Sequence, residues 1–248
     1  NYNAGSVMRI KASVIVLQGM PGSEALGQRA VRSCHRFSNM ETDVFQAITP
    51  IDNPQGIAES KGLDFRPFLS QDYSDIDAAL AAFLSHYHLW LRALETETTQ
   101  LILEHDARIK RPLGIDDELF GYEILNLGRP SYGRVRKSKR KGPQSLFSKT
   151  HLPGAHAYAV TAEGARQLIY KSHSEPIEPV DLFINIQRFA GIGEVFPWPA
   201  EAIDSFSTIQ LEKGATNKHR FSRSYSFLNS SGEPRERSHK QHQIKADG

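Results

Sequence analysis

The sequence predicts an α/β protein whose central sheet is flanked by helices. Three pairs of elements support this class: a strand and a helix joined by a glycine-bearing loop over 12–37, a long amphipathic helix followed by an apolar strand over 76–103, and a short strand followed by a helix over 156–169. With 248 residues, 39% of them hydrophobic, the chain is long enough to bury the core that such a sheet needs.

The first of these pairs contains a candidate phosphate-binding turn. Residues 12–17 are predicted to form a buried strand, and the glycines and proline of 19–23 mark a loop. Ser23 is expected to cap the helix that continues to Phe37, because a serine side chain accepts hydrogen bonds from the first helical amides. Such amides can hold a phosphate, so the candidate binding residues here are Gly19, Gly22 and Arg29. The loop is neither a GxGxxG motif nor a P-loop, and a purely structural turn is the alternative.

The helix of the second pair carries two histidines that do not form a metal pair. Apolar residues recur at helical spacing over 76–94, and Ser74 or Asp75 can cap the start. His86 and His88 are two positions apart, so they lie on different faces and cannot bind one zinc ion together. We predict that each is a packed, hydrogen-bonded histidine.

Two carboxylates follow the next strand. Residues 101–103 are apolar and predict a buried strand, and alternation would place Glu104 and Asp106 on one face at its end. In α/β proteins this end of a parallel strand opens into the ligand-binding crevice. Neighbouring carboxylates repel each other unless a cation lies between them, so one interpretation is a hard divalent ion whose remaining ligands come from a diphosphate. The other interpretation is a strand that ends in a solvated polar turn.

The remaining elements are shorter. Strands are expected at 42–48, 121–128 and 156–160, and Thr161 is expected to cap the helix of the third pair. The basic stretch 129–149 lacks periodicity, and we interpret it as a long loop that is either functional or disordered.

Positive charge is concentrated in two segments. One loop carries +6 without an acid, from Arg134, Arg136, Lys137, Lys139, Arg140 and Lys141. The segment 213–248 carries +5, and because the whole chain is only +2, the remainder is net −9. We therefore predict a domain at 9–212 and a basic, flexible tail at 213–248, with an anionic partner such as nucleic acid for the basic segments. A solvated, disordered segment is the alternative.

Cysteine usage and hydropathy bear on location. The single cysteine, Cys34, excludes an internal disulfide, which agrees with a reducing, cytoplasmic environment. The apolar run 14–17 is far too short to span a membrane, so no transmembrane segment is predicted.

Several stretches, in this order, resemble glycosyltransferase family 25, which contains lipooligosaccharide galactosyltransferases and the collagen galactosyltransferase domains. Residues 84–90 are similar to the family's Leu-Ser-His-x-x-x-Trp helix, and 103–107 (Leu-Glu-His-Asp-Ala) to its Leu-Glu-Asp-Asp-Ala strand end. Other matching stretches are Leu125-Asn126-Leu127-Gly128, Gly154-Ala155-His156-Ala157-Tyr158 with Gly164-Ala165, Pro179-Val180-Asp181 and Ser207-Thr208-Ile209. The resemblance covers roughly 12–210.

The resemblance implies a GT-A fold, which is a Rossmann-like mixed sheet with a nucleotide-sugar bound across the strand ends. It further implies a UDP-hexose donor, a Mn²⁺ or Mg²⁺ ion held by Glu104 and Asp106, and transfer with inversion to an acceptor hydroxyl. An acceptor that engages the basic loop would be anionic, either a lipooligosaccharide or a modified base in DNA.

Four more residues receive candidate roles from the resemblance. Asp181 is the candidate general base that inversion requires, with a helix N-cap as the alternative. Ser85 and His86 are assigned to donor binding. His156 is a candidate third metal ligand or phosphate contact, with a buried structural histidine as the alternative.

One residue departs from the family's pattern. The central aspartate of the acidic motif is His105 in this chain. If the outer carboxylates hold the metal, Glu104 and Asp106 suffice. If the central residue is essential, the chain is a catalytically weak member that acts by binding a polyanion, and this is the second functional hypothesis.

Overall fold

The computed structural model describes residues 10–37, 40–70, 75–113, 121–131 and 134–203. Three sequence predictions therefore lie outside the described residues: the basic tail at 213–248, the motif at 207–209 and Ser74 as a helix cap.

Seven strands form the main sheet, in the order β2-β1-β3-β7-β5-β8-β6, and β4 and β9 form a small second sheet. The strands are β1 (Ile10–Val16), β2 (Glu41–Gln46), β3 (Thr99–Glu104), β4 (Ala107–Ile109), β5 (Ile124–Asn126), β6 (Gly142–Ser145), β7 (Ala157–Val160), β8 (Ile192–Phe196) and β9 (Ala200–Ala202).

The main sheet is mixed, and its connectivity decides which strand ends meet. β1 pairs in parallel with β2 and β3, and β5 pairs in parallel with β8. β7 runs antiparallel between β3 and β5, and β6 is antiparallel to β8. The carboxyl ends of β3 and β5 therefore lie beside the amino end of β7, along one edge of the sheet that we call the site edge.

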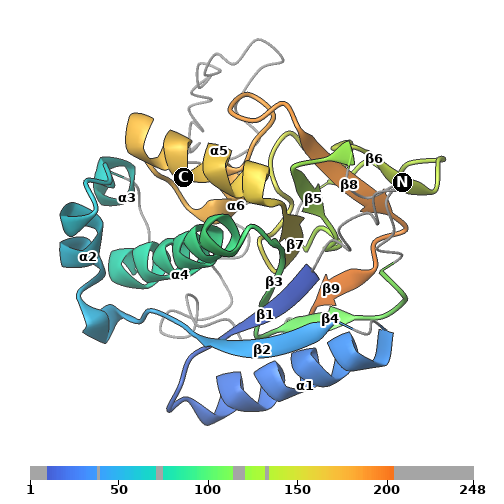
Figure 1. Ribbon diagram of the computed structural model, residues 1–248, viewed down its shortest axis with the longest axis horizontal. Helices are drawn as coiled ribbons and strands as arrows, with labels where there is room; N and C mark the ends of the chain where they lie inside the picture. Colours follow the sequence, from blue (N-terminus) through green and yellow to red (C-terminus); the bar gives the residue numbers. More distant parts are fainter. Residues whose placement is uncertain (1–9, 38–39, 71–74, 114–120, 132–133, 204–248) are drawn as a thin grey trace, which may run out of the picture. The chain divides into compact units, whose positions relative to one another are not determined.

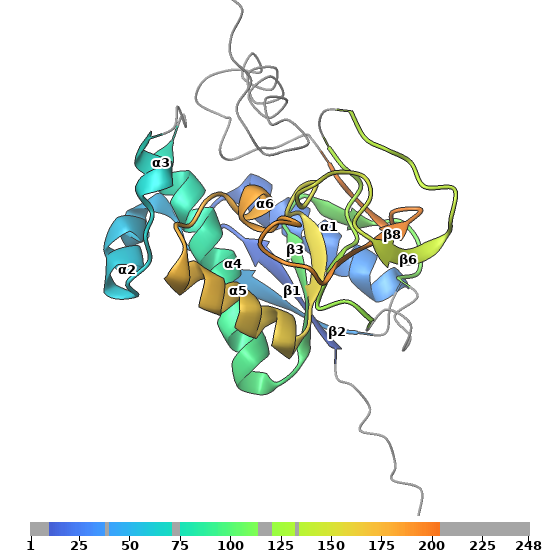
Figure 2. The ribbon, with the colours of Figure 1, turned by 90° about the horizontal axis from the view of Figure 1, so that it is seen from above.

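Helices cover both faces of the sheet (Figures 1 and 2). They are α1 (Pro21–Phe37), the 3₁₀ helix at Pro50–Asp52, α2 (Pro54–Ser60), α3 (Arg66–Ser70), α4 (Ile76–Thr96), α5 (Ala162–Ser174) and α6 (Val180–Phe183). One apolar core joins α1 to Val14 and Leu101, and the other joins α4, α5 and α6 to Ile15 and Ile102. Neighbouring residues of one strand thus enter opposite cores, as alternation requires. This architecture confirms the predicted α/β class with a mixed sheet between helices.

α1 begins at Pro21, two residues before the predicted cap. Proline suits a first helical turn because its missing N–H would have no helical acceptor there. The capping prediction for Ser23 is wrong, because Ser23 is itself a residue of the first helical turn. Its hydroxyl oxygen accepts a hydrogen bond from Leu17 N, before the helix, at 2.9 Å. Gly27 permits close packing on β1, since a Cβ at this position would lie 2.4 Å from Val16 Cγ2.

α4 follows the prediction closely. The Asp75 side chain caps it by accepting a hydrogen bond from Ala78 N at 2.8 Å. The helix ends where Glu97 adopts a left-handed conformation, with φ of 50°. As expected of a packed histidine, His88 Nδ1 lies 2.8 Å from Leu84 O on the preceding turn. The α4 helix, which packs beside the site edge, is therefore capped at both ends.

The basic stretch 129–149 is more ordered than the loop interpretation implied. Its residues 142–145 form β6 at the edge of the sheet, with Gly142 opposite Phe196 and Ser145 opposite Gly193. Pro143 is compatible with an edge strand, because an edge has one side that needs no ladder hydrogen bonds. The local composition did not predict this strand, because its pairing partner β8 lies about fifty residues away in the chain.

Candidate active site

The acidic motif lies at the site edge, but its three residues do not form one continuous strand. β3 ends at Glu104, whose backbone N–H donates to His156 O at 3.0 Å. His105 and Asp106 form a turn, and β4 starts at Ala107. The prediction that alternation continues through Asp106 is therefore wrong, because the chain leaves the β3 ladder to pair with β9. Glu104 and Asp106 are nevertheless both half-buried at the same strand end.

The Glu104 carboxylate is surrounded by imidazole rings. Its side chain is 36% exposed, and Oε1 lies 3.4 Å from His86 Nε2. Burial by itself raises the pKa of Glu104, but the hydrogen bond and charge of His86, followed by His156 and His105, lower the pKa further than burial raises it. The pKa of Glu104 therefore lies below its ordinary value, and the group is a carboxylate at neutral pH.

Behind Glu104, the family-like helix motif supplies buried support. His86 is 1% exposed, and its Nδ1 lies 2.9 Å from the hydroxyl of Tyr158. The Ser85 hydroxyl donates to Ala81 O and accepts from Ile48 N, both at 2.9 Å, so it ties α4 to the segment after β2. Both side chains are buried, which favours support of the site over direct donor contact.

His156 occupies a slot between two glycines. A Cβ at Gly128 would lie 2.4 Å from His156 Nε2, and a Cβ at Gly154 would lie 2.9 Å from His156 Nδ1. Gly154 also has a φ of 110°, which disfavours other residues. Asn126 fixes the first wall, because its side chain donates to Gly128 O and accepts from Gly128 N. This explains why both family-like motifs place glycine near the histidine: the ring is buried, at 3% exposure, and its position is tightly defined.

The candidate base lies on α6 near Lys149, a residue that no sequence motif indicated. Asp181 is the second residue of that helix, so it is not the N-cap; that position is Pro179. Burial lowers the pKa of Lys149, while the negative charge of Asp181 acts in the opposite direction. In turn, the positive charge of Lys149 favours the carboxylate form of Asp181.

Folded stability is expected to fall between pH 6.5 and 4 because of His151. Burial, and secondarily the charge of Lys149, lowers the pKa of His151 to about 4 from 6.5. As the pH falls, the unfolded chain gains a proton on this residue before the folded chain does, so about 3 kcal/mol of stability is lost by pH 4. His151→Gln should reduce the loss by this amount, measured by urea unfolding at pH 7 and pH 4. Equal losses in wild type and variant would show that folded His151 protonates normally.

A fully buried carboxylate anchors the segment that carries Lys149 and His151. Glu194 on β8 is 0% exposed and accepts hydrogen bonds from five neutral donors. They are Asn126 Nδ2, Trp198 Nε1, Ser148 Oγ, Ser148 N and Phe147 N, at 2.7–3.3 Å. These bonds satisfy polar oxygens that would otherwise be costly to bury, and they hold Phe147 and Ser148 against β8.

The glycine-bearing loop before α1 differs from the phosphate cradle that we predicted. Gly19 has a φ of 78°, and its N–H donates to Glu24 Oε1 at 2.8 Å. The Glu24 carboxylate thus already accepts the hydrogen bond of Gly19 N–H, one of the amides that we predicted to bind an anion. Gly22 is half-buried inside the first turn of α1, and Arg29 is exposed two turns further along the helix. A phosphate at this loop would have to compete with Glu24.

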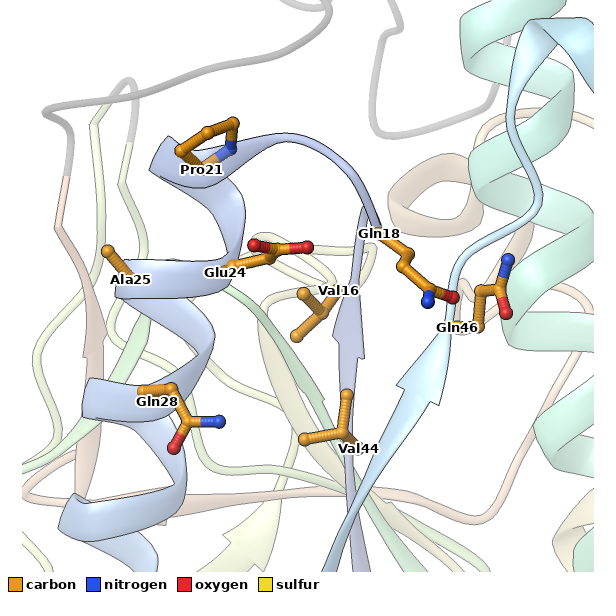
Figure 3. A pocket seen from close by; sticks show the side chains of 8 residues that line it. All are labelled: Val16, Gln18, Pro21, Glu24, Ala25, Gln28, Val44 and Gln46. Carbon is orange, nitrogen blue, oxygen red and sulfur yellow. The ribbon is translucent and has the colours of Figure 1, made fainter.

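A pocket of about 700 Å³ lies between α1 and the ends of β1 and β2 (Figure 3). Its lining is Val16, Gln18, Pro21, Glu24, Ala25, Gln28, Val44 and Gln46. Val16 belongs to the core on the α1 side of the sheet, whereas Glu104 contacts His86 on the α4 side. The pocket therefore does not include the acidic motif, where His86, His156 and His105 act on the charge of Glu104.

The basic loop is exposed. All six of its lysines and arginines have exposed side chains, and none of them makes an ion pair with another described residue. Their charge is thus available to an anionic partner.

Among the residues that the structure describes, no cluster of three or more His, Cys, Asp or Glu side chains could hold a metal ion. No helix in the described segments is long and apolar enough to cross a membrane.

Comparison with known proteins adds one informative match. No family model matches the chain. A "Glycosyltransferase 25 family member" from Anopheles gambiae is 25% identical over 116 residues, which is 43% of this chain and 20% of that relative. The resemblance to glycosyltransferase family 25 is confirmed. The chain thus matches only a fifth of the length of that relative.

Solved structures similar to this chain are also glycosyltransferases. One is a glycosyltransferase involved in the glycosylation of the major capsid of PBCV-1, with 10% identity, a TM-score of 0.35, and coverage of 68% of this chain and 69% of that one. Another is an active-site mutant of LgtC, with 11% identity, a TM-score of 0.44, and coverage of 87% and 95%. The glycosyltransferase 25-like motifs of this chain are best interpreted through their geometry: the Leu-Ser-His-x-x-x-Trp helix supports the acidic strand end, and the two glycine motifs enclose His156.

Proposed function

We propose that the chain is a metal-dependent glycosyltransferase that moves a hexose from a UDP-sugar to an acceptor hydroxyl with inversion. The observation that carries the proposal is the Glu104 carboxylate, which is partly exposed at a strand end, has a lowered pKa, and is two residues from the half-buried Asp106. The match to a glycosyltransferase 25 family member supports the reaction class.

The donor set fits a hard divalent cation. Mn²⁺ and Mg²⁺ prefer oxygen ligands and are commonly held by one or two protein carboxylates together with substrate phosphates and water. Two carboxylates at the end of one strand, two residues apart in the sequence, match that pattern. Glu104 and Asp106 would hold the ion, which would neutralise charge on the departing diphosphate.

The chain's own residues account for the other requirements of the reaction. Asp181 would accept the proton of the acceptor hydroxyl, and Lys149 favours the ionised form that this task needs. His156 would contact a donor phosphate or the ion, because its ring is held near Glu104 by its glycine slot. Gly19, Gly22 and Arg29 stay candidates for donor contact only if the donor displaces Glu24 from Gly19 N.

A direct assay tests the function. The purified chain is incubated with a panel of UDP-hexoses and Mn²⁺, and released UDP is measured with and without EDTA. We expect release from at least one donor, loss of release with EDTA, and a higher thermal transition with UDP and Mn²⁺ because ligands stabilise the native state they bind. Absence of both release and stabilisation across the panel would contradict the proposal.

The exposed basic loop supports a second candidate function, binding of a polyanion such as nucleic acid without catalysis. This alternative agrees with His105, which stands where the family has an aspartate. The two functions combine if the acceptor is anionic and the loop binds it.

Replacing Lys137, Lys139, Arg140 and Lys141 by serine is expected to raise the acceptor KM and to leave UDP-sugar hydrolysis unchanged. The physical reason is that these exposed charges attract an anion through solvent, an effect that salt weakens strongly. Acceptor KM is measured over a salt series for both proteins. A wild-type KM that does not change with salt would exclude an electrostatic acceptor site.

A further inference from the structure

Glu104 lies at the end of a buried chain of polar contacts that crosses from α4 to β7 and back. Trp90 Nε1 donates to the Tyr158 hydroxyl at 2.8 Å, and that hydroxyl lies 2.9 Å from His86 Nδ1. On the other side of the ring, His86 Nε2 lies 3.4 Å from Glu104 Oε1. Trp90 and Tyr158 are both 0% exposed, so water does not compete for these groups.

The indole of Trp90 determines which group donates at each step of this series of polar contacts. An indole N–H can only donate, so the Tyr158 oxygen is an acceptor for Trp90. Burial raises the pKa of the Tyr158 hydroxyl, and although the Trp90 bond opposes this, the charge of Glu104 adds to it. The hydroxyl therefore keeps its single proton, and within the described part of the chain the acceptor in reach of that proton is His86 Nδ1.

A proton donated to Nδ1 fixes the tautomer of the histidine. When Nδ1 acts as an acceptor, the ring carries a proton on Nε2, the nitrogen that faces Glu104. The His86 and Tyr158 rings are also stacked, with centroids 5.7 Å apart and an interplanar angle of 19°, so the imidazole cannot rotate freely. Within the described residues, the Glu104 oxygen in contact with His86 is Oε1.

We propose that Trp90, Tyr158 and His86 form a directed hydrogen-bond relay that positions the Glu104 carboxylate for a divalent cation. His86 and Tyr158 are thus positioning residues, and they act on the ion only through Glu104. The proposal deepens the glycosyltransferase function and rests on it for the cation. A glutamate side chain free in solution samples several rotamers, and the relay selects one of them before the ion arrives.

The test compares two tyrosines that make the same kind of bond. Tyr158→Phe removes the hydroxyl of the relay. Tyr87→Phe is the matched control, because the Tyr87 hydroxyl lies 2.9 Å from His173 Nε2 between α4 and α5 and does not touch Glu104. Mn²⁺ affinity is measured by calorimetry in the presence of UDP, and we expect Tyr158→Phe to bind Mn²⁺ about 10-fold or more weakly while Tyr87→Phe binds it as wild type does.

A second variant and a metal-free measurement keep the test independent of folding defects and of activity. His86→Gln keeps an amide donor where Nε2 lies but loses the acceptor for Tyr158, so its Mn²⁺ affinity should fall between those of wild type and His86→Leu. In ¹⁵N-histidine NMR spectra of the metal-free protein, the signals that disappear in His86→Gln should report a ring protonated on Nε2 alone.

The outcomes separate this inference from the function on which it rests. Equal Mn²⁺ affinity in wild type, Tyr158→Phe and His86→Leu would overturn the relay and leave the transferase intact. A His86 ring protonated on Nδ1 would also overturn it. A wild type that binds no Mn²⁺ with UDP would instead contradict the metal-dependent transferase, and with it the purpose of the relay, whatever the NMR spectra show.

Discussion

Asp181→Asn is expected to lower glycosyl transfer by about 10²- to 10⁴-fold while donor binding persists. Asparagine keeps the size of the side chain and an acceptor oxygen, but it cannot take up a proton. The measurement is single-turnover transfer at saturating donor, alongside UDP affinity from calorimetry.

The matched control for this variant is Asp77→Asn. Asp77 on α4 accepts a hydrogen bond from Gln55 Nε2 at 2.7 Å, and an asparagine can still accept it. Asp77→Asn should transfer at the wild-type rate. Wild-type transfer by a folded Asp181→Asn protein would remove Asp181 from the mechanism and direct attention to other carboxylates near the strand ends.

Asp106→Ala is expected to abolish metal-dependent donor binding without unfolding the protein. In the metal-free protein Glu104 and Asp106 carry like charges at one strand end, so removing one of them should leave the metal-free stability unchanged or slightly higher. With one carboxylate left, a divalent ion loses half of its protein ligands. Calorimetric titration of Mn²⁺ with UDP present, together with thermal unfolding without metal, separates the two effects.

Asp64→Ala serves as the control for this second variant. It removes the ion pair between Asp64 and the exposed side chain of Arg66, and neither residue is part of the acidic motif. Its Mn²⁺ and UDP affinities should match those of wild type. If Asp106→Ala also matched wild type, the acidic motif would not be the cation site, and the proposed mechanism would fail.

Elements with local signals were predictable from the sequence. The Asp75 cap depends on residues within one helical turn, and so does the Thr161 cap, whose side chain accepts from Gly164 N at 3.0 Å. Strands β4, β6 and β9 were not predicted, because short segments such as 142–145 become strands only through pairing with distant partners. The turn at His105 was missed for the same reason, since its cause is the pairing of β4 with β9.

The candidate site shows the same division. Only the resemblance, through the candidate metal role of His156, implied that Glu104 and His156 lie close together, and their environment was not predicted. The sequence identified Tyr158 only as one residue of a family-like motif. The residues next to it in the sequence did not indicate its contact with Trp90, which is 68 positions away. Glu194 gave no signal at all, because a glutamate in an apolar strand becomes tolerable only when folding brings five donors to it.

The glycine slot around His156 makes three positions of the sequence interdependent. A methyl group at Gly128 or Gly154 meets the imidazole, so an alanine at either position is harmful while the histidine is present. If position 156 carried a smaller residue, alanine at 128 would find room, while at 154 the positive φ would still disfavour it. Mutational effects at 128 and 156 should therefore be strongly non-additive, and related sequences that lose the histidine are released from the constraint on the first glycine but not on the second.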